Sequence, residues 1–304
     1  KFRPVLKRKK SLTSIFWGLL GALLIGTSDT IARITSQRLS ITILILIIMS
    51  LSSVLMTIWF LINWNWPSWD LYSWTASVIS GFLNLIAVAF LYKALARGPV
   101  YVASPATASY SVILILINVS IGELFTLTQL LASLVVFFGI VMLSSKSKNL
   151  SNEKKYDSKW LRVTALLGVG AGITIALRFF FAQESIEFLG AEHALYLNRI
   201  SAFVFILIFF IFNNMNRKNF ALPKGTTRIF VLVQAILETL ALAAFLYGSV
   251  NNGRIGATIG FSTFAIVTSV VSWIWLGEKI PRNKFFWIII ITIAIILSII
   301  YAPN

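Results

Sequence analysis

The residues of this sequence that could do chemistry are charged side chains inside long apolar stretches. Glu238 lies near the middle of Thr226–Gly248, one helical turn after Gln234, among apolar and small residues. An ionised group at membrane depth is costly unless it is paired or hydrated, so Glu238 must face the interior of a helix bundle or a cavity. Because burial favours the protonated carboxyl, Glu238 is a candidate for ligand binding or proton coupling. A structural hydrogen bond, or an ion pair with Arg178 or Arg199, is the alternative.

Two arginines could bind an anion. Arg178 lies late in the apolar stretch 160–183, and Arg199 lies early in the next stretch, 194–212, beside Asn198. A guanidinium can donate two parallel hydrogen bonds to a carboxylate or phosphate, and we favour Arg199 for this role. Arg178 is also a candidate for coupling or gating. Alternatively, both side chains extend to the membrane surface and pair with the acidic residues of the segment 184–193.

Asp29 and Arg33 stand four residues apart in the first apolar stretch. This spacing places them on one helix face and predicts that they neutralise each other as an ion pair. The functional alternative is that they form a gate or a coupling site.

Polar residues on two further stretches complete the candidate site. Tyr92 and Tyr247 lie near the ends of their stretches, where a phenol either anchors a helix at the membrane interface or caps a cavity. Asn84 lies at mid-depth, as Glu238 does. The predicted binding residues are Glu238, Gln234, Asn84, Arg199, Tyr92 and Tyr247.

The composition argues against metal and covalent chemistry. The chain has no cysteine and one histidine, His193, which excludes disulfides, thiol chemistry and clusters of His or Cys ligands. It also lacks the GxxxxGK[ST] phosphate-binding pattern and a dinucleotide fingerprint. We expect no metal, no cofactor and no enzymatic activity.

Membrane-spanning helices must position these residues. The chain is 58% hydrophobic and 12% charged, which is too apolar for a soluble domain. Crossing a bilayer takes about 20 apolar residues in a helix, and continuous rather than alternating apolar runs exclude a barrel. We predict an all-α integral membrane protein with ten transmembrane helices. The predicted spans are 12–34, 39–62, 71–95, 101–121, 126–143, 160–183, 194–212, 226–248, 255–276 and 285–301.

The net charge of +16 indicates a membrane surface rather than nucleic acid. The basic residues fall in short loops and in the tail 1–11, beside apolar stretches, so anionic lipid headgroups are the expected partners. No small-residue cleavage site follows the tail, so we expect the first apolar stretch to act as its own membrane signal.

The chain contains an internal repeat. The segment AFLYKALARGPVYVASPATASYSVILILINVSIGE (89–123) aligns without a gap with AFLYGSVNNGRIGATIGFSTFAIVTSVVSWIWLGE (244–278), at a constant offset of 155 residues. This divides the chain into a first five-helix repeat (12–145), a polar linker (146–159) and a second five-helix repeat (160–304). An odd number of helices in each half predicts that the two repeats are inverted relative to each other, as in many secondary transporters.

These two segments, each ending in Gly-Glu (Gly122-Glu123 and Gly277-Glu278), resemble the EamA-like branch of the drug/metabolite transporter superfamily. That family usually has a proline about a dozen residues before Gly-Glu, where this chain has Tyr110 and Ala265. Pro105 and Gly260, which are 155 residues apart, are the nearest candidates for breaking the two helices. Freed backbone there could line a cavity, although an ordinary packed kink is the alternative.

The architecture and the resemblance together imply a secondary transporter of a small organic solute that works by alternating access. An amino acid or similar zwitterion is the best candidate, since one acidic and one guanidinium group complement its charges, and protons are a possible coupling ion. An exchanger of anionic metabolites, such as sugar phosphates or nucleotide-linked compounds, is the first alternative. A lipid-handling or assembly subunit without solute flux is the second.

We expect the protein to lie in a prokaryotic cell (inner) membrane. Its orientation there is indicated in opposite ways by two features of the sequence. The resemblance and the basic tail imply that both termini are cytoplasmic, whereas most basic loop residues would then lie outside, against the positive-inside rule. Orientation stays open, and the sequence does not separate a monomer from a dimer.

Overall fold

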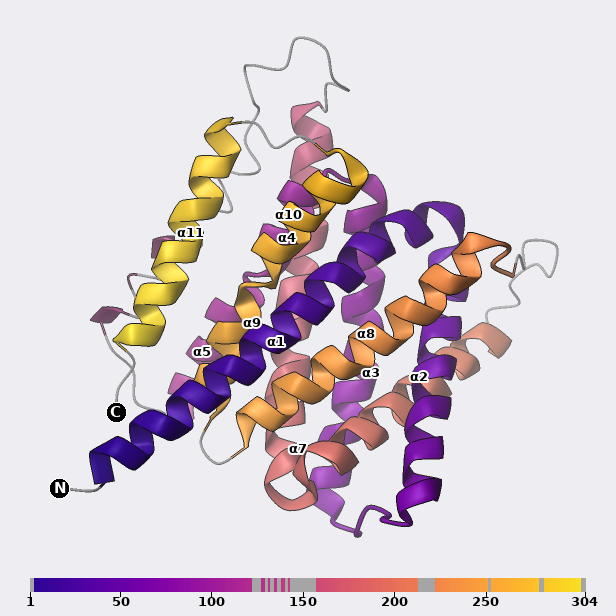
Figure 1. The fold of residues 1–304 in the computed structure, drawn as a ribbon. Helices are drawn as coiled ribbons and strands as arrows, with labels where there is room; N and C mark the ends of the chain where they lie inside the picture. Colours follow the sequence, from indigo (N-terminus) through magenta and orange to yellow (C-terminus); the bar gives the residue numbers. More distant parts are fainter. Residues whose placement is uncertain are drawn as a thin grey trace.

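The computed structural model describes residues 3–121, 157–212, 222–250, 253–278 and 282–301, with scattered positions between 127 and 142. Within these ranges the regular structure is helical and contains no strand (Figure 1). The helices are α1 (Arg3–Arg38), α2 (Ile41–Asn63), α3 (Leu71–Arg97), α4 (Val100–Thr107), α5 (Tyr110–Ser120), α7 (Ser158–Phe212), α8 (Thr226–Ser249), α9 (Arg254–Ser262), α10 (Phe264–Leu276) and α11 (Arg282–Ile300).

The described part of the chain contains seven helical stretches that are long and apolar enough to cross a membrane. α4 with α5, and α9 with α10, each count as one such stretch. These stretches indicate a helical integral membrane protein. Helices suit a membrane because their backbone polar groups are hydrogen-bonded to one another without water. About half of the predicted span 126–143, most of the linker 146–159 and the side chains of the tail 1–11 lie outside the described residues, so the count of ten spans stays a prediction.

Polar side chains cap the N-termini of two of the helices. The Ser40 hydroxyl accepts a hydrogen bond from the Ile43 backbone N–H at 3.4 Å at the start of α2. Asp70 accepts one from the Ser73 N–H at 2.8 Å at the start of α3. Hydrogen bonds from the Ser73 hydroxyl and backbone N–H also hold the pKa of Asp70 below its usual value. These caps supply acceptors for backbone donors that have no partner inside the helix.

The predicted spans 101–121 and 255–276 are each broken into two helices. The breaks lie at Ala108–Ser109 and at Thr263, so Ala108 and Thr263 stand at the repeat offset of 155 residues. Both breaks come three residues after the predicted positions, because α4 continues past Pro105 and α9 past Gly260. At the second break the Thr263 hydroxyl donates to the Gly260 carbonyl at 2.8 Å, which offers the backbone an alternative to the helical bond.

Gly260 was predicted to break the helix, but in the structure it packs closely against α1. A Cβ atom at this position would come within 2.6 Å of the Ile15 carbonyl oxygen and 3.0 Å of the Gly18 Cα. Only glycine therefore allows α9 to approach α1 this closely.

The segment 184–193 is helical rather than the predicted loop between two spans. α7 runs from Ser158 to Phe212 with one non-helical residue, Gly190, at φ 76° and ψ 170°. A single glycine can adopt this backbone conformation without the steric penalty of a side chain, so one residue replaces a longer connection.

The first helix of each half packs on the broken helices of the other half. α1 contacts α8, α9 and α10, and α7 contacts α3, α4 and α5; Figure 1 shows α1 and α8 running side by side. Small residues make these contacts: a Cβ at Gly18 would lie 2.5 Å from the Ala257 carbonyl oxygen, and one at Gly168 would lie 2.6 Å from the Ala106 Cβ. The two crossings place α1, α4, α7 and α9 around one central region.

Candidate functional site

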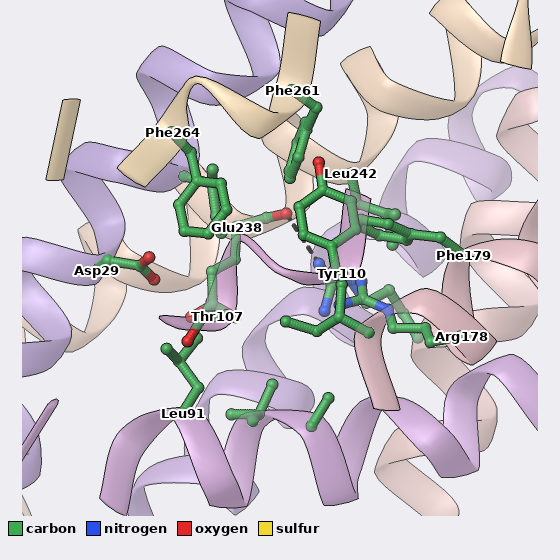
Figure 2. A pocket seen from close by; sticks show the side chains of 15 residues that line it. Asp29, Leu91, Thr107, Tyr110, Arg178, Phe179, Glu238, Leu242, Phe261 and Phe264 are labelled. Atoms are coloured by element: carbon green, nitrogen blue, oxygen red, sulfur yellow. Dashed lines mark hydrogen bonds between the residues drawn. The ribbon is translucent and has the colours of Figure 1, made fainter. Parts of the chain in front are cut away.

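A cavity of about 50 Å³ lies where these helices meet (Figure 2). This volume has room for a few water molecules. Its lining combines four charged residues with aromatic and aliphatic ones from both halves of the chain. The lining residues are Ile25, Asp29, Ala87, Val88, Leu91, Thr107, Tyr110, Ile175, Arg178, Phe179, Arg199, Glu238, Leu242, Phe261 and Phe264.

The four charged residues of the cavity are buried, with exposed fractions of 1% for Asp29, 9% for Arg178, 1% for Arg199 and 6% for Glu238. Asp29 comes from α1, Arg178 and Arg199 from α7, and Glu238 from α8. In the described part of the chain, the ion pairs within 4 Å join other residues, so none links a cavity carboxylate to a cavity guanidinium. The cavity thus holds two carboxyl groups and two guanidinium groups that form no ion pair with each other.

Glu238 is held by a hydrogen-bonded network. Its Oε1 accepts hydrogen bonds from the Tyr92 hydroxyl and, at 3.3 Å, from Gln234 Nε2. Gln234 Nε2 also donates to the Tyr92 oxygen at 2.7 Å, and Gln234 Oε1 accepts from the Thr35 hydroxyl at 2.8 Å. This network joins α1, α3 and α8, and it brings together three of the residues predicted for binding.

Arg199 is anchored to the same region of α8. Its Nη2 donates to the backbone carbonyl of Glu238 at 2.9 Å, and its Nη1 lies 3.8 Å from the Met49 sulfur. The amide of Asn84 donates to the same sulfur at 3.5 Å, so Asn84 lies behind Arg199 and does not line the cavity. The Nε of Arg199 and the Oδ1 of Asn84 are buried without a hydrogen-bond partner.

Arg178 and Asp29 have unpartnered polar atoms. The Arg178 guanidinium carbon lies 5.0 Å from the centroid of the Phe179 ring, and its Nε is buried without a hydrogen-bond partner. The Oδ2 of Asp29 is likewise buried and unpartnered. Both arginines thus lie inside the bundle, not at the membrane surface as the alternative interpretation had them.

Comparison with known proteins bears on what such a cavity does. A model of the EamA-like transporter family matches residues 12–145 and 162–300. The chain belongs to the EamA-like transporter family. As a member it is a membrane transporter of small solutes and not an enzyme.

The fold agrees with a solved protein structure. A structure described as the crystal structure of a protein superposes with a TM-score of 0.67 over 97% of each chain, at 12% sequence identity. At this identity the likeness concerns the fold alone. A search of curated proteins found no match.

The predicted ion pair between Asp29 and Arg33 does not form in this EamA-like transporter. Arg33 Nε pairs with Glu278 at 3.0 Å, and its Nη1 donates to the Leu95 and Ala96 carbonyls at 2.5 and 2.6 Å. Carbonyls at the C-terminal end of α3 attract a cation, so they compete for Arg33 with the carboxylate on its own helix. Arg33 is therefore outside the cavity, and Asp29 is left without it.

Tyr247 also lies outside the cavity. Its side chain is 41% exposed, its hydroxyl donates to Glu192, and its ring stacks on Trp17 with centroids 5.7 Å apart. Its repeat equivalent, Tyr92, is fully buried and binds Glu238, so the interface alternative is wrong for Tyr92. The difference follows from the repeat, because Leu83 stands where the first half would need a carboxylate equivalent to Glu238.

The aromatic wall of the cavity was not predicted. Phe179, Phe261 and Phe264 line it, and Tyr110 donates from its hydroxyl to the Thr258 carbonyl at 3.2 Å. One feature of the sequence indicated this wall: Tyr110 occupies a position where the family usually has proline. The phenylalanines carried no signal, because any of the 24 in this apolar chain could face lipid or protein.

Proposed function

We propose that this transporter carries a small zwitterionic solute, with an amino acid as the best candidate, by secondary transport. The observation that supports this most directly is the set of four buried charges, two of each sign, around one cavity. A solute with an ammonium and a carboxylate complements both signs at once. Its binding would supply hydrogen bonds and opposite charges to groups that are costly to leave unpaired inside the protein.

We propose a mechanism of alternating access, in which a site within ten helices, arranged as two inverted repeats, opens to each side of the membrane in turn. One pair of equivalent positions of the two halves lines the same cavity, since Ala87 and Leu242 are 155 residues apart. The crossed packing of α1 on α9 and of α7 on α4 also supports the inverted arrangement. A site between such halves can be opened to either side by moving one half against the other.

The cavity volume supports a mechanism with moving walls. About 50 Å³ accommodates a few water molecules and not an amino acid with its side chain. Admission of an organic solute therefore requires the helices around the cavity to separate.

Proton coupling through Glu238 is part of the proposal. In proteoliposomes, we expect solute flux by the wild type to change with pH and flux by Glu238→Gln to lose that dependence, because a neutral amide cannot carry a proton. Asp70→Asn is a suitable control, since Asp70 caps α3 far from the cavity and asparagine caps a helix equally well. Equal rates for wild type and Glu238→Gln across the pH range would remove Glu238 from coupling.

The solute class can be tested by thermal unfolding of the purified protein with the twenty amino acids. A ligand that binds only the folded state at 100 times its Kd adds about 2.7 kcal/mol of stability, which raises the unfolding midpoint. We expect at least one zwitterion to do so. Stabilisation by sugar phosphates or nucleotide-linked compounds alone would contradict a zwitterionic solute.

Exchange of an anionic metabolite is the second candidate function, because two arginines line the cavity. It predicts that neutralising Arg178 or Arg199 abolishes binding while Glu238→Gln has little effect. A lipid-handling or assembly role is less well supported, since it does not account for four charged residues around a buried central cavity. The proposal also includes residence in a prokaryotic cell membrane, with anionic lipid headgroups around exposed basic residues such as Lys224 and Arg228.

A further inference from the structure

We infer that Asp29 and Arg178 are the two poles of the solute site, Asp29 for the ammonium and Arg178 for the carboxylate. The inference rests on the proposed zwitterionic solute and assigns its contacts. The most prominent pair in the sequence was Glu238 with Arg199, and the structure points to the other two charges of the cavity. Glu238 and Arg199 then serve as positioning residues.

The two carboxylates differ in what already binds them. Glu238 Oε1 accepts hydrogen bonds from Tyr92 and Gln234, so its nearest donors belong to the protein. The Asp29 carboxyl has the Thr268 hydroxyl as a neighbouring donor, but its Oδ2 is buried in the cavity wall with no hydrogen-bond partner, on a residue that is 1% exposed. A buried acceptor without a donor is expensive, and a ligand ammonium is the donor that best compensates it.

The two guanidiniums differ in the same way. Arg199 donates to the Glu238 carbonyl, which fixes its fork against α8. The Nε atoms of both arginines are buried without a partner, but the described contact of the Arg178 guanidinium is with the Phe179 ring, and no described hydrogen bond fixes it. Arg178 therefore has donors to offer to a carboxylate that enters the cavity.

Asp29 and Arg178 line the same cavity from different helices. Figure 2 shows Asp29 on one side of the cavity and Arg178 on the other, with Glu238 and Tyr110 between them in this view. Asp29 belongs to α1 of the first half and Arg178 to α7 of the second half. A zwitterion held at both ends would draw together the two halves, whereas a pure cation or anion would bind only one of them.

Truncated ligands can assign each pole separately. Leucine suits the apolar lining, 3-methylbutylamine is leucine without the carboxylate, and 4-methylpentanoate is leucine without the ammonium. Binding of all three to the purified full chain would be measured by calorimetry. We expect Asp29→Asn to weaken leucine and 3-methylbutylamine by about 10- to 100-fold and to change 4-methylpentanoate less than about twofold.

Arg178→Gln should give the reverse pattern, weakening leucine and 4-methylpentanoate while sparing 3-methylbutylamine. Glu238→Gln should not discriminate between the two truncated ligands. Asp70→Asn and Arg228→Gln are the charge-matched controls, because both residues lie outside the cavity and Arg228 is exposed. If either neutral variant fails to fold, Asp29→Glu and Arg178→Lys replace it and should retain the preference of their pole.

Three outcomes would overturn the assignment in distinguishable ways. Wild-type protein that binds neither leucine nor any other amino acid would contradict the proposed function and the assignment with it. Wild-type binding of leucine that Asp29→Asn leaves unchanged, or that Asp29→Asn weakens equally for all three ligands, would contradict the assignment alone. Loss of pH dependence in Asp29→Asn with unchanged leucine affinity would make Asp29 a proton site instead.

Discussion

At the residue scale, the Tyr92 hydroxyl determines how Glu238 is held. It donates to the carboxylate from α3, across the boundary between the two halves, and is itself contacted by Gln234. A hydrogen bond to a charged acceptor inside a membrane protein has few competing partners, so its loss leaves the carboxylate less well solvated.

Replacing Tyr92 with phenylalanine should lower the free energy of unfolding by about 1–3 kcal/mol, because the buried carboxylate loses its hydroxyl donor. Tyr247→Phe is the matched control at the equivalent repeat position. Its hydroxyl binds Glu192 near the surface, where water can replace it, so we expect a change of at most about 0.5 kcal/mol. Thermal or denaturant unfolding in detergent would measure both, and equal losses would contradict the special role of Tyr92.

The sequence indicated which polar residue types lie at which depth in the membrane, but it did not indicate the direction in which each side chain points. Glu238, Gln234 and Tyr92 could be proposed for one site because polar groups at membrane depth must turn inward. Which inward partner each would find depends on the rotation of each helix about its axis, which the sequence does not show. Asp29 illustrates this, since its intrahelical neighbour Arg33 turns to the end of α3 and to Glu278.

At the element scale, the two broken helices form the part of the bundle on which α1 and α7 pack. Hydropathy predicted each as one span, and the repeat correctly indicated that any irregularity would occur in both. Both breaks come three residues after Pro105 and Gly260, and at the second one the Thr263 hydroxyl donates to the Gly260 carbonyl. The connection inside α7 was missed because a single glycine suffices for it.

The packing of α9 on α1 can be tested at Gly260. Gly260→Ala would place its Cβ 2.6 Å from the Ile15 carbonyl oxygen, so the two helices must separate, and we expect a loss of about 1–3 kcal/mol. Gly170→Ala is the control, because its Cβ would meet the Phe90 ring at an ordinary 3.5 Å. There the gain in helix propensity should leave stability unchanged or raise it by up to about 1 kcal/mol. Similar losses for both variants would contradict the packing account.

At the scale of the whole molecule, polar clusters lie near both ends of the apolar stretch Thr13–Arg38 of α1. At one end Arg33 joins the end of α3 to Glu278, which also accepts from the Val100 N–H at 3.0 Å. At the other end Arg254 pairs with Glu184 at 2.6 Å, close to where Ser14 contacts Gly253. Ser14 and Arg33 are roughly 28 Å apart along the helix, so the two clusters lie on either side of the cavity.

Breaking the cluster of Arg33 and Glu278 should make the cavity accessible from that end of α1. We expect Arg33→Gln to increase the rate at which an impermeant thiol reagent labels Ala87→Cys, which lies in the cavity wall, because the pairing that holds α1, α3 and Glu278 together is lost. The chain has no native cysteine, so the background is silent. Arg228→Gln in the same background is the control, and an unchanged labelling rate in Arg33→Gln would show that this cluster does not limit access.

If the transported solute passes through the charged cavity, a bulky group attached to the cavity wall must block it, and the cysteine-free chain allows a direct test of this. Exchange of labelled leucine would be measured in proteoliposomes containing the wild type or Ala87→Cys, before and after reaction with a bulky thiol reagent. We expect modification to abolish exchange by Ala87→Cys and to leave exchange by the wild type unaffected. Full exchange by completely modified Ala87→Cys protein would contradict it.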